Sequence, residues 1–181
     1  MKIKLIPVIE ITHYNQEVKF PEKGPYWEHP DDFERYSKEC LIKAGFPDQM
    51  KSYANGSGFY ELSEVSDKNL LLEIILWTDG YTIEEICPLY GGYVLNIDGI
   101  NILFPQCCGD LSDIKRWKDI ANGNDPYYWE GHPVPLISIK KDKVIFDLTV
   151  KEDDEYFVPP PPQNIIKIER TELVQAVNRA E

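Results

Sequence analysis

The sequence predicts an α+β fold: a mostly antiparallel sheet built from hairpins, with about three helices packed on it. Two hairpin signals and three amphipathic helix patterns carry this prediction, because strands joined by short turns pair antiparallel. The chain has 181 residues, 43% of them hydrophobic, so a core can form without disulfides or a metal. No composition shift or internal repeat marks a boundary, which predicts a single globular domain over residues 1–181.

The clearest strand signal is a hairpin of residues 93–97 and 100–104, because Asp98-Gly99 between them favours a type I′ turn. A two-residue turn predicts that Asn96 faces Asn101. On the other face it predicts three pairs, Ile97 with Ile100, Leu95 with Ile102 and Tyr93 with Phe104.

A second hairpin joins about residues 134–140 to 143–150. Its turn is either the two residues Lys141-Asp142 or longer, because a two-residue loop would place Lys140 opposite Lys143. Residues 2–11 and 69–78 are predicted as further strands, and residues 165–169 as a short one.

Three helices have recognisable ends. The first runs from about Asp31 to Ala44 and ends at Gly45. The second is capped by Asp110 and closes at Asn122-Gly123, and the third begins at a Thr171 cap. The four prolines at 159–162 predict a stiff polyproline II connector before the last strand and helix.

The charge of the chain limits its function. A net charge of −12 and a pI of about 4.7 argue against nucleic acid as a partner. No apolar run is long enough to span a membrane, and the four cysteines are typical of reduced thiols in a cytoplasmic protein. Glycine-rich phosphate loops, serine elbows and metal-ligand spacings are absent, so we expect no cofactor, no metal and no enzyme activity.

One region holds residue types that could carry chemistry. Cys107, Cys108 and Asp110 follow a predicted strand, and His132 precedes another, so they could meet at one end of the sheet. A thiol next to an imidazole can become a nucleophile, which gives the alternative of an enzyme or small-ligand domain with a pocket here. The other interpretation of these residues is purely structural. In it one cysteine is buried, Asp110 caps a helix, and Gly131 and Pro133 shape a turn.

An acidic run next to two aromatic residues is the predicted partner-binding site. It consists of Glu152, Asp153, Asp154, Glu155, Tyr156 and Phe157. Charge speeds the encounter with a basic protein, and buried aromatic side chains slow its dissociation. The alternative for the acidic run is a solvated loop.

The stretch 102–111, the helix that carries Trp117 and the turn 129–133 together resemble small bacterial proteins of toxin–immunity loci. The resemblance covers about residues 95–140 and includes no motif with an established catalytic role. It implies a single-domain cytoplasmic protein that binds and neutralises a cognate toxin, often a nuclease. We therefore expect an acidic protein-binding protein, such as an immunity protein, with a structural subunit as a third possibility.

Overall fold

The computed structural model describes residues 1–124, 131–149 and 155–181. It confirms the α+β class, with a four-stranded antiparallel sheet, a three-stranded sheet and four α-helices among these residues. The described helices include none that is both long and apolar enough to cross a membrane. The chain divides into two compact units, which we call the larger unit (residues 1–7 and 90–181) and the smaller unit (residues 8–89). A single domain stays a prediction.

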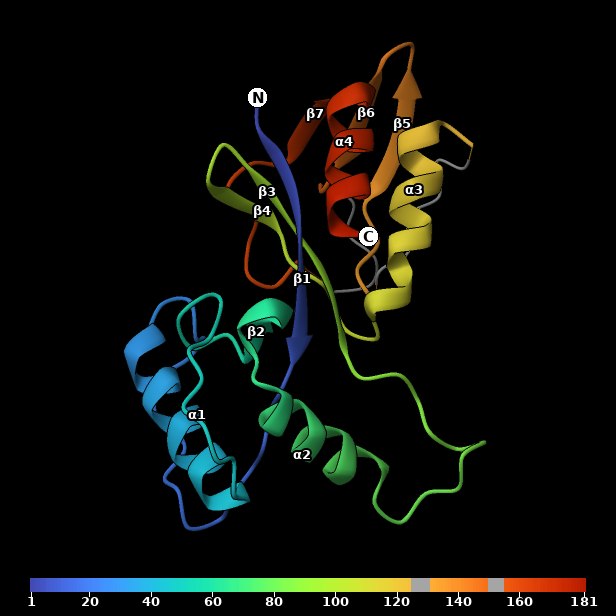
Figure 1. Cartoon of the computed structure of the whole chain (residues 1–181). Helices are drawn as coiled ribbons and strands as arrows, with labels where there is room; N and C mark the ends of the chain where they lie inside the picture. Colours follow the sequence, from blue (N-terminus) through green and yellow to red (C-terminus); the bar gives the residue numbers. More distant parts are fainter. Residues whose placement is uncertain (125–130, 150–154) are drawn as a thin grey trace. The chain divides into compact units, whose positions relative to one another are not determined.

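The four-stranded sheet has the order β2-β1-β3-β4 (Figure 1). Its strands are β1 (Ile3–Glu10), β2 (Phe59–Glu61), β3 (Gly91–Ile97) and β4 (Ile100–Leu103). The expected strand over residues 2–11 is confirmed as β1, whereas β2 has no counterpart among the predictions. The first five residues of β1 belong to the larger unit, and its last three pair with β2 in the smaller unit.

The hairpin of β3 and β4 has the predicted turn, with φ of 52° at Asp98 and 89° at Gly99. Asn96 faces Asn101, and Nδ2 of Asn96 donates to Oδ1 of Asn101 at 2.7 Å. The predicted pair of Ile97 with Ile100 is also confirmed, but further from the turn the predicted register is wrong. A β-bulge between Leu95 and Asn96 shifts it, so Leu95 pairs with Leu103 and not with Ile102. The bulge adds one extra residue on β4. Side chains that strict alternation would place on one face of the hairpin therefore do not stay on the same face beyond the bulge.

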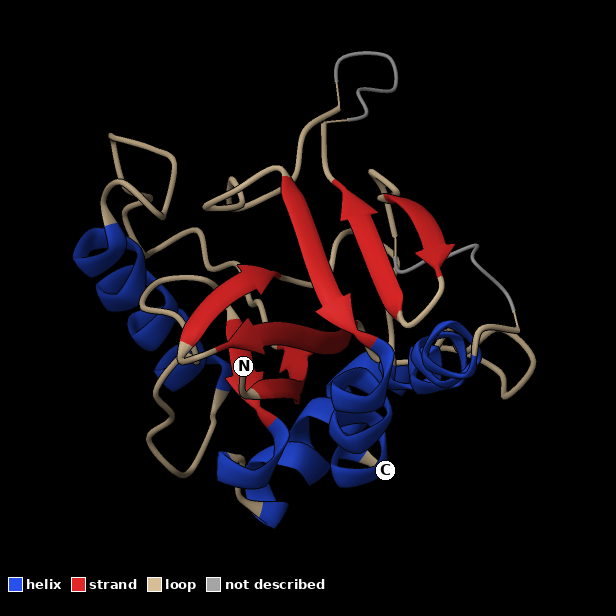
Figure 2. Ribbon diagram, turned by 90° about the horizontal axis from the view of Figure 1, so that it is seen from above, coloured by secondary structure: helices blue, strands red, loops and turns tan. Residues whose placement is uncertain are grey.

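The second hairpin lies in a three-stranded antiparallel sheet with the order β5-β6-β7 (Figure 2, red arrows). Its strands are β5 (Leu136–Lys140), β6 (Lys143–Asp147) and β7 (Ile165–Glu169). The loop is the two-residue alternative, with Lys141 at a φ of 54°, and Lys140 does lie opposite Lys143. Glu169 of β7 offsets this like-charge pair, since its Oε1 lies 3.1 Å from Nζ of Lys143.

In the larger unit, a 3₁₀ turn (Leu111–Asp113) leads into α3 (Ile114–Asn122), which packs beside α4 (Arg170–Ala180) (Figure 1). The prediction that Thr171 caps the last helix is wrong, because α4 begins one residue earlier. Arg170 sets this start. Its backbone N–H donates to the carbonyl of Asp142, and its guanidinium donates to the carbonyls of Ala121 and Asn122 at the end of α3.

The smaller unit contains α1 (Pro30–Ala44) and α2 (Asp67–Thr78). The first helix is as predicted and ends at Gly45, which has a φ of 90°. The prediction of a strand over residues 69–78 is wrong, because this segment is α2. Ser66 caps it by accepting a hydrogen bond from the backbone N–H of Asn69. A short apolar run without clear periodicity fits a buried strand or a helix equally well, and here the cap decides.

The core of the larger unit is one cluster of buried side chains from both sheets and from α3 and α4. Trp117 of α3 and Phe146 of β6 have no exposed surface, and their ring centroids lie 5.7 Å apart. This contact joins the helix layer to the three-stranded sheet. Since β7, α4 and the start of β1 contribute to the same cluster, the larger unit depends on it.

We expect Phe146→Ala to lower the free energy of unfolding by about 3–5 kcal/mol, because it removes a buried ring and leaves a cavity. Denaturant unfolding measures the change. The control is Leu136→Ala on the neighbouring strand, where the side chain is exposed, with an expected cost within about 0.5 kcal/mol. Equal costs for the two variants would contradict the placement of this core.

Candidate functional site

The structure brings Cys107 and His132 together, as the sequence suggested for these two segments. The two residues form an isolated antiparallel bridge, in which the backbone N–H of His132 donates to the carbonyl of Cys107 at 3.2 Å. Both residues are exposed. The contact is a backbone one, and it fixes the two loops side by side. Trp129 and Glu130 of the predicted turn lie outside the described residues.

Gly131 is what allows the two loops to come this close. Its φ is 83°, and a Cβ atom placed on it would lie 1.9 Å from the carbonyl oxygen of Cys107. Such a separation is shorter than any non-bonded contact, so only glycine fits at this position. The close approach of the Cys107 carbonyl is therefore the physical reason why this turn requires glycine at position 131.

The two adjacent thiols contact one another, with 3.5 Å between the Sγ atoms of Cys107 and Cys108. This hydrogen bond, more than partial burial, raises the pKa of the Cys108 thiol. A raised pKa leaves less thiolate at neutral pH, which is the opposite of what activates a nucleophilic cysteine. Cys40, Cys87, Cys107 and Cys108 are all free thiols.

Asp110 is engaged in starting a helix. Its carboxylate accepts from the backbone N–H of Ser112 at 2.6 Å, and Asp113 Oδ2 accepts from the backbone N–H of Asp110 at 3.1 Å. This is the reciprocal capping box that the predicted cap implied. Over the described ranges, no three His, Cys, Asp or Glu side chains lie where they could hold a metal ion together.

Gln106 ties this region to the predicted partner-binding segment. Its side-chain amide donates to the carbonyl of Val158 at 3.0 Å and accepts from the backbone N–H of Val158 at 2.9 Å. Glu152, Asp153 and Asp154 of that segment lie outside the described residues. Glu155 and Tyr156 are exposed, whereas Phe157 belongs to the core of the larger unit and is 5% exposed. Within the described part of the segment, only Glu155 and Tyr156 are available to a partner.

The smaller unit holds a feature that the sequence reasoning missed, because residues 69–78 were taken for a strand. Helix α2 buries polar side chains and exposes apolar ones. Asn69 and Glu73 are buried one turn apart. Asn69 exchanges two hydrogen bonds with the backbone of Asp48, at 2.9 and 3.2 Å, and Oε2 of Glu73 lies 2.8 Å from Nε2 of His13. These contacts satisfy the buried polar groups and set the rotation of the helix.

Four aliphatic side chains of α2 are exposed, and we call them the α2 surface. Leu71, Ile74 and Ile75 lie away from Asn69 and Glu73, whereas Leu76 lies at the edge of the side that carries the buried pair. Leu71 is 59% exposed and Ile75, one turn on, is 54% exposed. The segment after α2 also exposes an aliphatic side chain, that of Ile83, which is 82% exposed. An amphipathic helix normally turns such residues inward, so this exposed aliphatic surface is a candidate contact surface.

The segment after α2 is held in place by its own hydrogen bonds. The indole N–H of Trp77 donates to the carbonyl of Cys87 at 2.8 Å, which returns the chain to the helix. The backbone N–H and hydroxyl of Thr82 both donate to Oε2 of Glu85, at 3.0 and 2.9 Å. These two bonds lower the pKa of the Glu85 carboxyl, so its negative charge is retained next to the apolar residues.

No family model, no curated protein and no solved structure matches this chain. The resemblance to proteins of toxin–immunity loci therefore stays a prediction.

We expect Gly131→Ala to destabilise the larger unit more than Gly99→Ala does. Both residues have a left-handed φ, which costs a side chain about 1–2 kcal/mol. Nothing lies within 4 Å of a Cβ at Gly99, whereas a Cβ at Gly131 also displaces the Cys107 carbonyl, so the total there should exceed about 3 kcal/mol. Denaturant unfolding compares the two variants, and equal losses would refute the close approach.

We expect Cys107→Ala to make Cys108 react faster with iodoacetamide at pH 8. The variant removes the hydrogen bond that raises the pKa of Cys108, so a larger fraction of this thiol is ionised. Peptide mapping by mass spectrometry follows Cys108, with Cys87 in the same sample as the reference thiol. An unchanged or slower rate at Cys108 would show that Cys107 does not suppress its ionisation.

Proposed function

We propose that this chain is an acidic protein-binding protein whose partner is a basic protein, docked on the α2 surface. The observation that carries the proposal is the inversion of α2, which buries Asn69 and Glu73 and leaves four aliphatic side chains in water. Full burial of an exposed aliphatic side chain contributes up to about 1.5–3 kcal/mol. A partner that covers the helix therefore gains affinity from the surface that these side chains, above all Leu71 and Ile75, expose in the free chain.

Charge identifies the kind of partner. Residues 67–89 contain five acidic side chains and one lysine, a net charge of −4. The smaller unit as a whole has 16 acidic and 7 basic residues, so it holds −9 of the −12 on the chain. An apolar centre with an acidic rim complements an apolar patch ringed by lysine and arginine. Two copies of this chain would each carry a net charge of −12, and the repulsion between them disfavours self-association.

The partner class that fits best is a nuclease-type toxin, and the chain would act as its immunity protein. A nuclease binds a phosphate backbone and so presents basic residues around its active site. An acidic protein that covers this surface competes with the nucleic acid directly. The resemblance of residues 95–140 to proteins of toxin–immunity loci supports this choice.

The test is a pull-down with the full chain from a lysate of the source organism at low salt. We expect it to capture a protein with more Lys and Arg than Asp and Glu, and we expect high salt to release it. The double variant Leu71→Glu/Ile75→Glu should weaken its binding at least about tenfold, because two central aliphatic contacts become charged. Isothermal titration with the purified captured protein measures the loss.

The matched control is Ile100→Glu, which places the same charge at an exposed aliphatic residue of the β3–β4 hairpin and should leave binding unchanged. Equimolar full chain should also abolish the nuclease activity of the captured protein. The proposal fails if no basic protein is captured, or if the double variant binds as the wild type does. It also fails if gel filtration shows a dimer that the double variant disrupts, since the second copy would then occupy the α2 surface.

A further inference from the structure

The smaller unit contains a cavity of about 360 Å³, within the range of about 300–1,000 Å³ that small-molecule sites span. Ile11 and Leu41, both buried, contribute apolar lining. The aromatic lining comes from three parts of the chain: the segment after β1, the segment before α1, and α1 itself. These residues are Tyr14, Phe20, Tyr26, Phe33 and Tyr36. So many rings around one small space are unusual for a gap left by imperfect packing.

The rings are fixed against one another. Phe20 meets Phe33 edge-on at 5.7 Å between centroids and Tyr36 at 5.1 Å, with interplanar angles of 87° and 74°. Phe20 is nevertheless 56% exposed, so it stands at the mouth of the cavity and not in the core. An edge-on pair occupies a face of only one of its two rings, so other ring faces remain, and the face of an aromatic ring is its electron-rich side.

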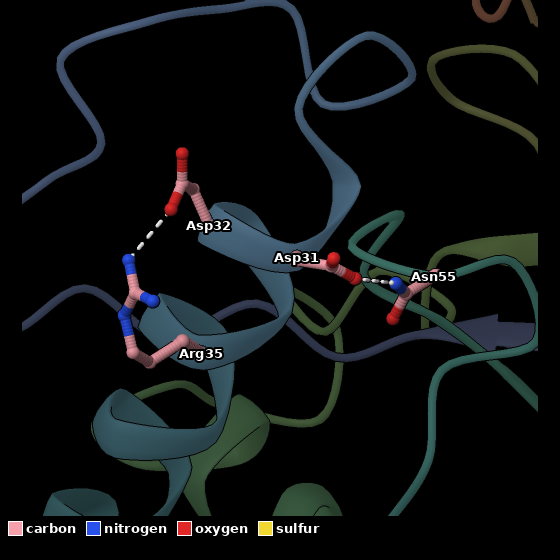
Figure 3. Close-up of polar contacts among 4 residues, drawn as sticks. All are labelled: Asp31, Asp32, Arg35 and Asn55. Atoms are coloured by element: carbon pink, nitrogen blue, oxygen red, sulfur yellow. Dashed lines mark hydrogen bonds and ion pairs between the residues drawn. The ribbon is translucent and has the colours of Figure 1, made fainter.

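The opposite wall is a loop held rigidly to α1. Asp31 accepts from the amide of Asn55 at 2.7 Å (Figure 3), and Glu34 accepts from the hydroxyl of Ser52 and from the backbone N–H of Gly56. A Cβ on Gly56 would lie 2.7 Å from the carbonyl oxygen of Pro30, so loop and helix touch directly. The cavity is therefore largely pre-formed, and a ligand need not order this wall when it binds.

The lining of the cavity includes no lysine, no arginine and no carboxylate. Its one side chain that can carry a positive charge is His13, whose Nε2 lies 2.8 Å from Oε2 of Glu73. Glu10 lies close enough to Tyr26 that its carboxylate helps burial to raise the pKa of that phenol. A neighbouring cavity, which shares Phe20 and Tyr36, does contain cations, namely Lys19, Lys23 and Arg35. Arg35 is paired with Asp32 at 2.6 Å (Figure 3) and Lys19 with Glu22 at 2.5 Å. An anionic ligand would find no open cation in the lining of the aromatic cavity.

We propose that this aromatic cavity binds a small organic cation with an apolar body, such as a quaternary ammonium group. Electron-rich ring faces attract such a cation, and the methyl groups around its nitrogen fit an apolar wall. The hydroxyls of Thr12, Ser37 and Ser57 in the lining can orient a polar tail on the ligand. This site is separate in its residues from the α2 surface and does not depend on the proposed partner.

The test uses choline and its neutral carbon isostere 3,3-dimethylbutan-1-ol, with the full chain and isothermal titration at constant ionic strength. The two probes have the same shape, so their difference in affinity reports the charge alone. We expect choline to bind at least about tenfold more tightly, the size of a cation–π contribution of about 1–2 kcal/mol. Equal affinities, or no binding of choline at millimolar concentration, would overturn the proposal.

The variant Phe20→Leu keeps apolar bulk at the mouth but removes the ring face, so it should weaken choline about tenfold and leave the isostere unchanged. Tyr81→Leu is the control, because Tyr81 is an exposed aromatic residue of the same unit that does not line the cavity. Circular dichroism and thermal unfolding should be the same for both variants. If Tyr81→Leu weakens choline as much as Phe20→Leu does, the cation is bound elsewhere and the site is wrong.

Discussion

The contact between Trp117 and Phe146 is the constraint on which the larger unit depends. It fixes α3 over the three-stranded sheet, and the 3₁₀ turn that leads into α3 is capped by Asp110. Because Asp110 is two residues after Cys108, the position of α3 restricts where Cys107 lies, and there His132 bridges to it. The bridge between Cys107 and His132 is a backbone contact, and the Asp110 carboxylate accepts from a backbone N–H. These contacts explain how folding brings the two loops side by side.

In the smaller unit, by contrast, polar contacts form part of the interior and aliphatic residues of α2 are exposed. Asn69 and Glu73 give α2 its rotation because each has a specific partner, Asp48 and His13. Turning the helix by half a turn would bury more apolar surface but would leave Asp48 and His13 without these bonds. Buried polar groups without partners are costly, so the rotation is locked. The exposed aliphatic side is the consequence, and it persists without any strain in the helix.

The features that could be predicted from the sequence are those with local causes. The turn at Asp98-Gly99, the end of α1 at Gly45 and the Asp110 cap each depend on a few neighbouring residues. The features that could not be predicted depend on distant partners. The bulge at Leu95 has no local signal, and the rotation of α2 is set by Asp48 and His13 far away in the chain. Of the candidate site, the pairing of the two loops was foreseeable, whereas the α2 surface and the aromatic cavity required the fold.

The charge of the chain takes on a different meaning once it is divided by unit and not by position along the sequence. The first and second halves of the sequence share the excess acid almost evenly, but the smaller unit holds −9 and the larger one −3. The smaller unit also carries the exposed aliphatic residues of α2 and the aromatic cavity, whose lining includes no lysine and no arginine. Negative charge and exposed apolar surface together favour ligands that are both cationic and apolar, and like charge disfavours the pairing of two copies. Both proposed sites therefore lie in the unit where the excess acid is concentrated.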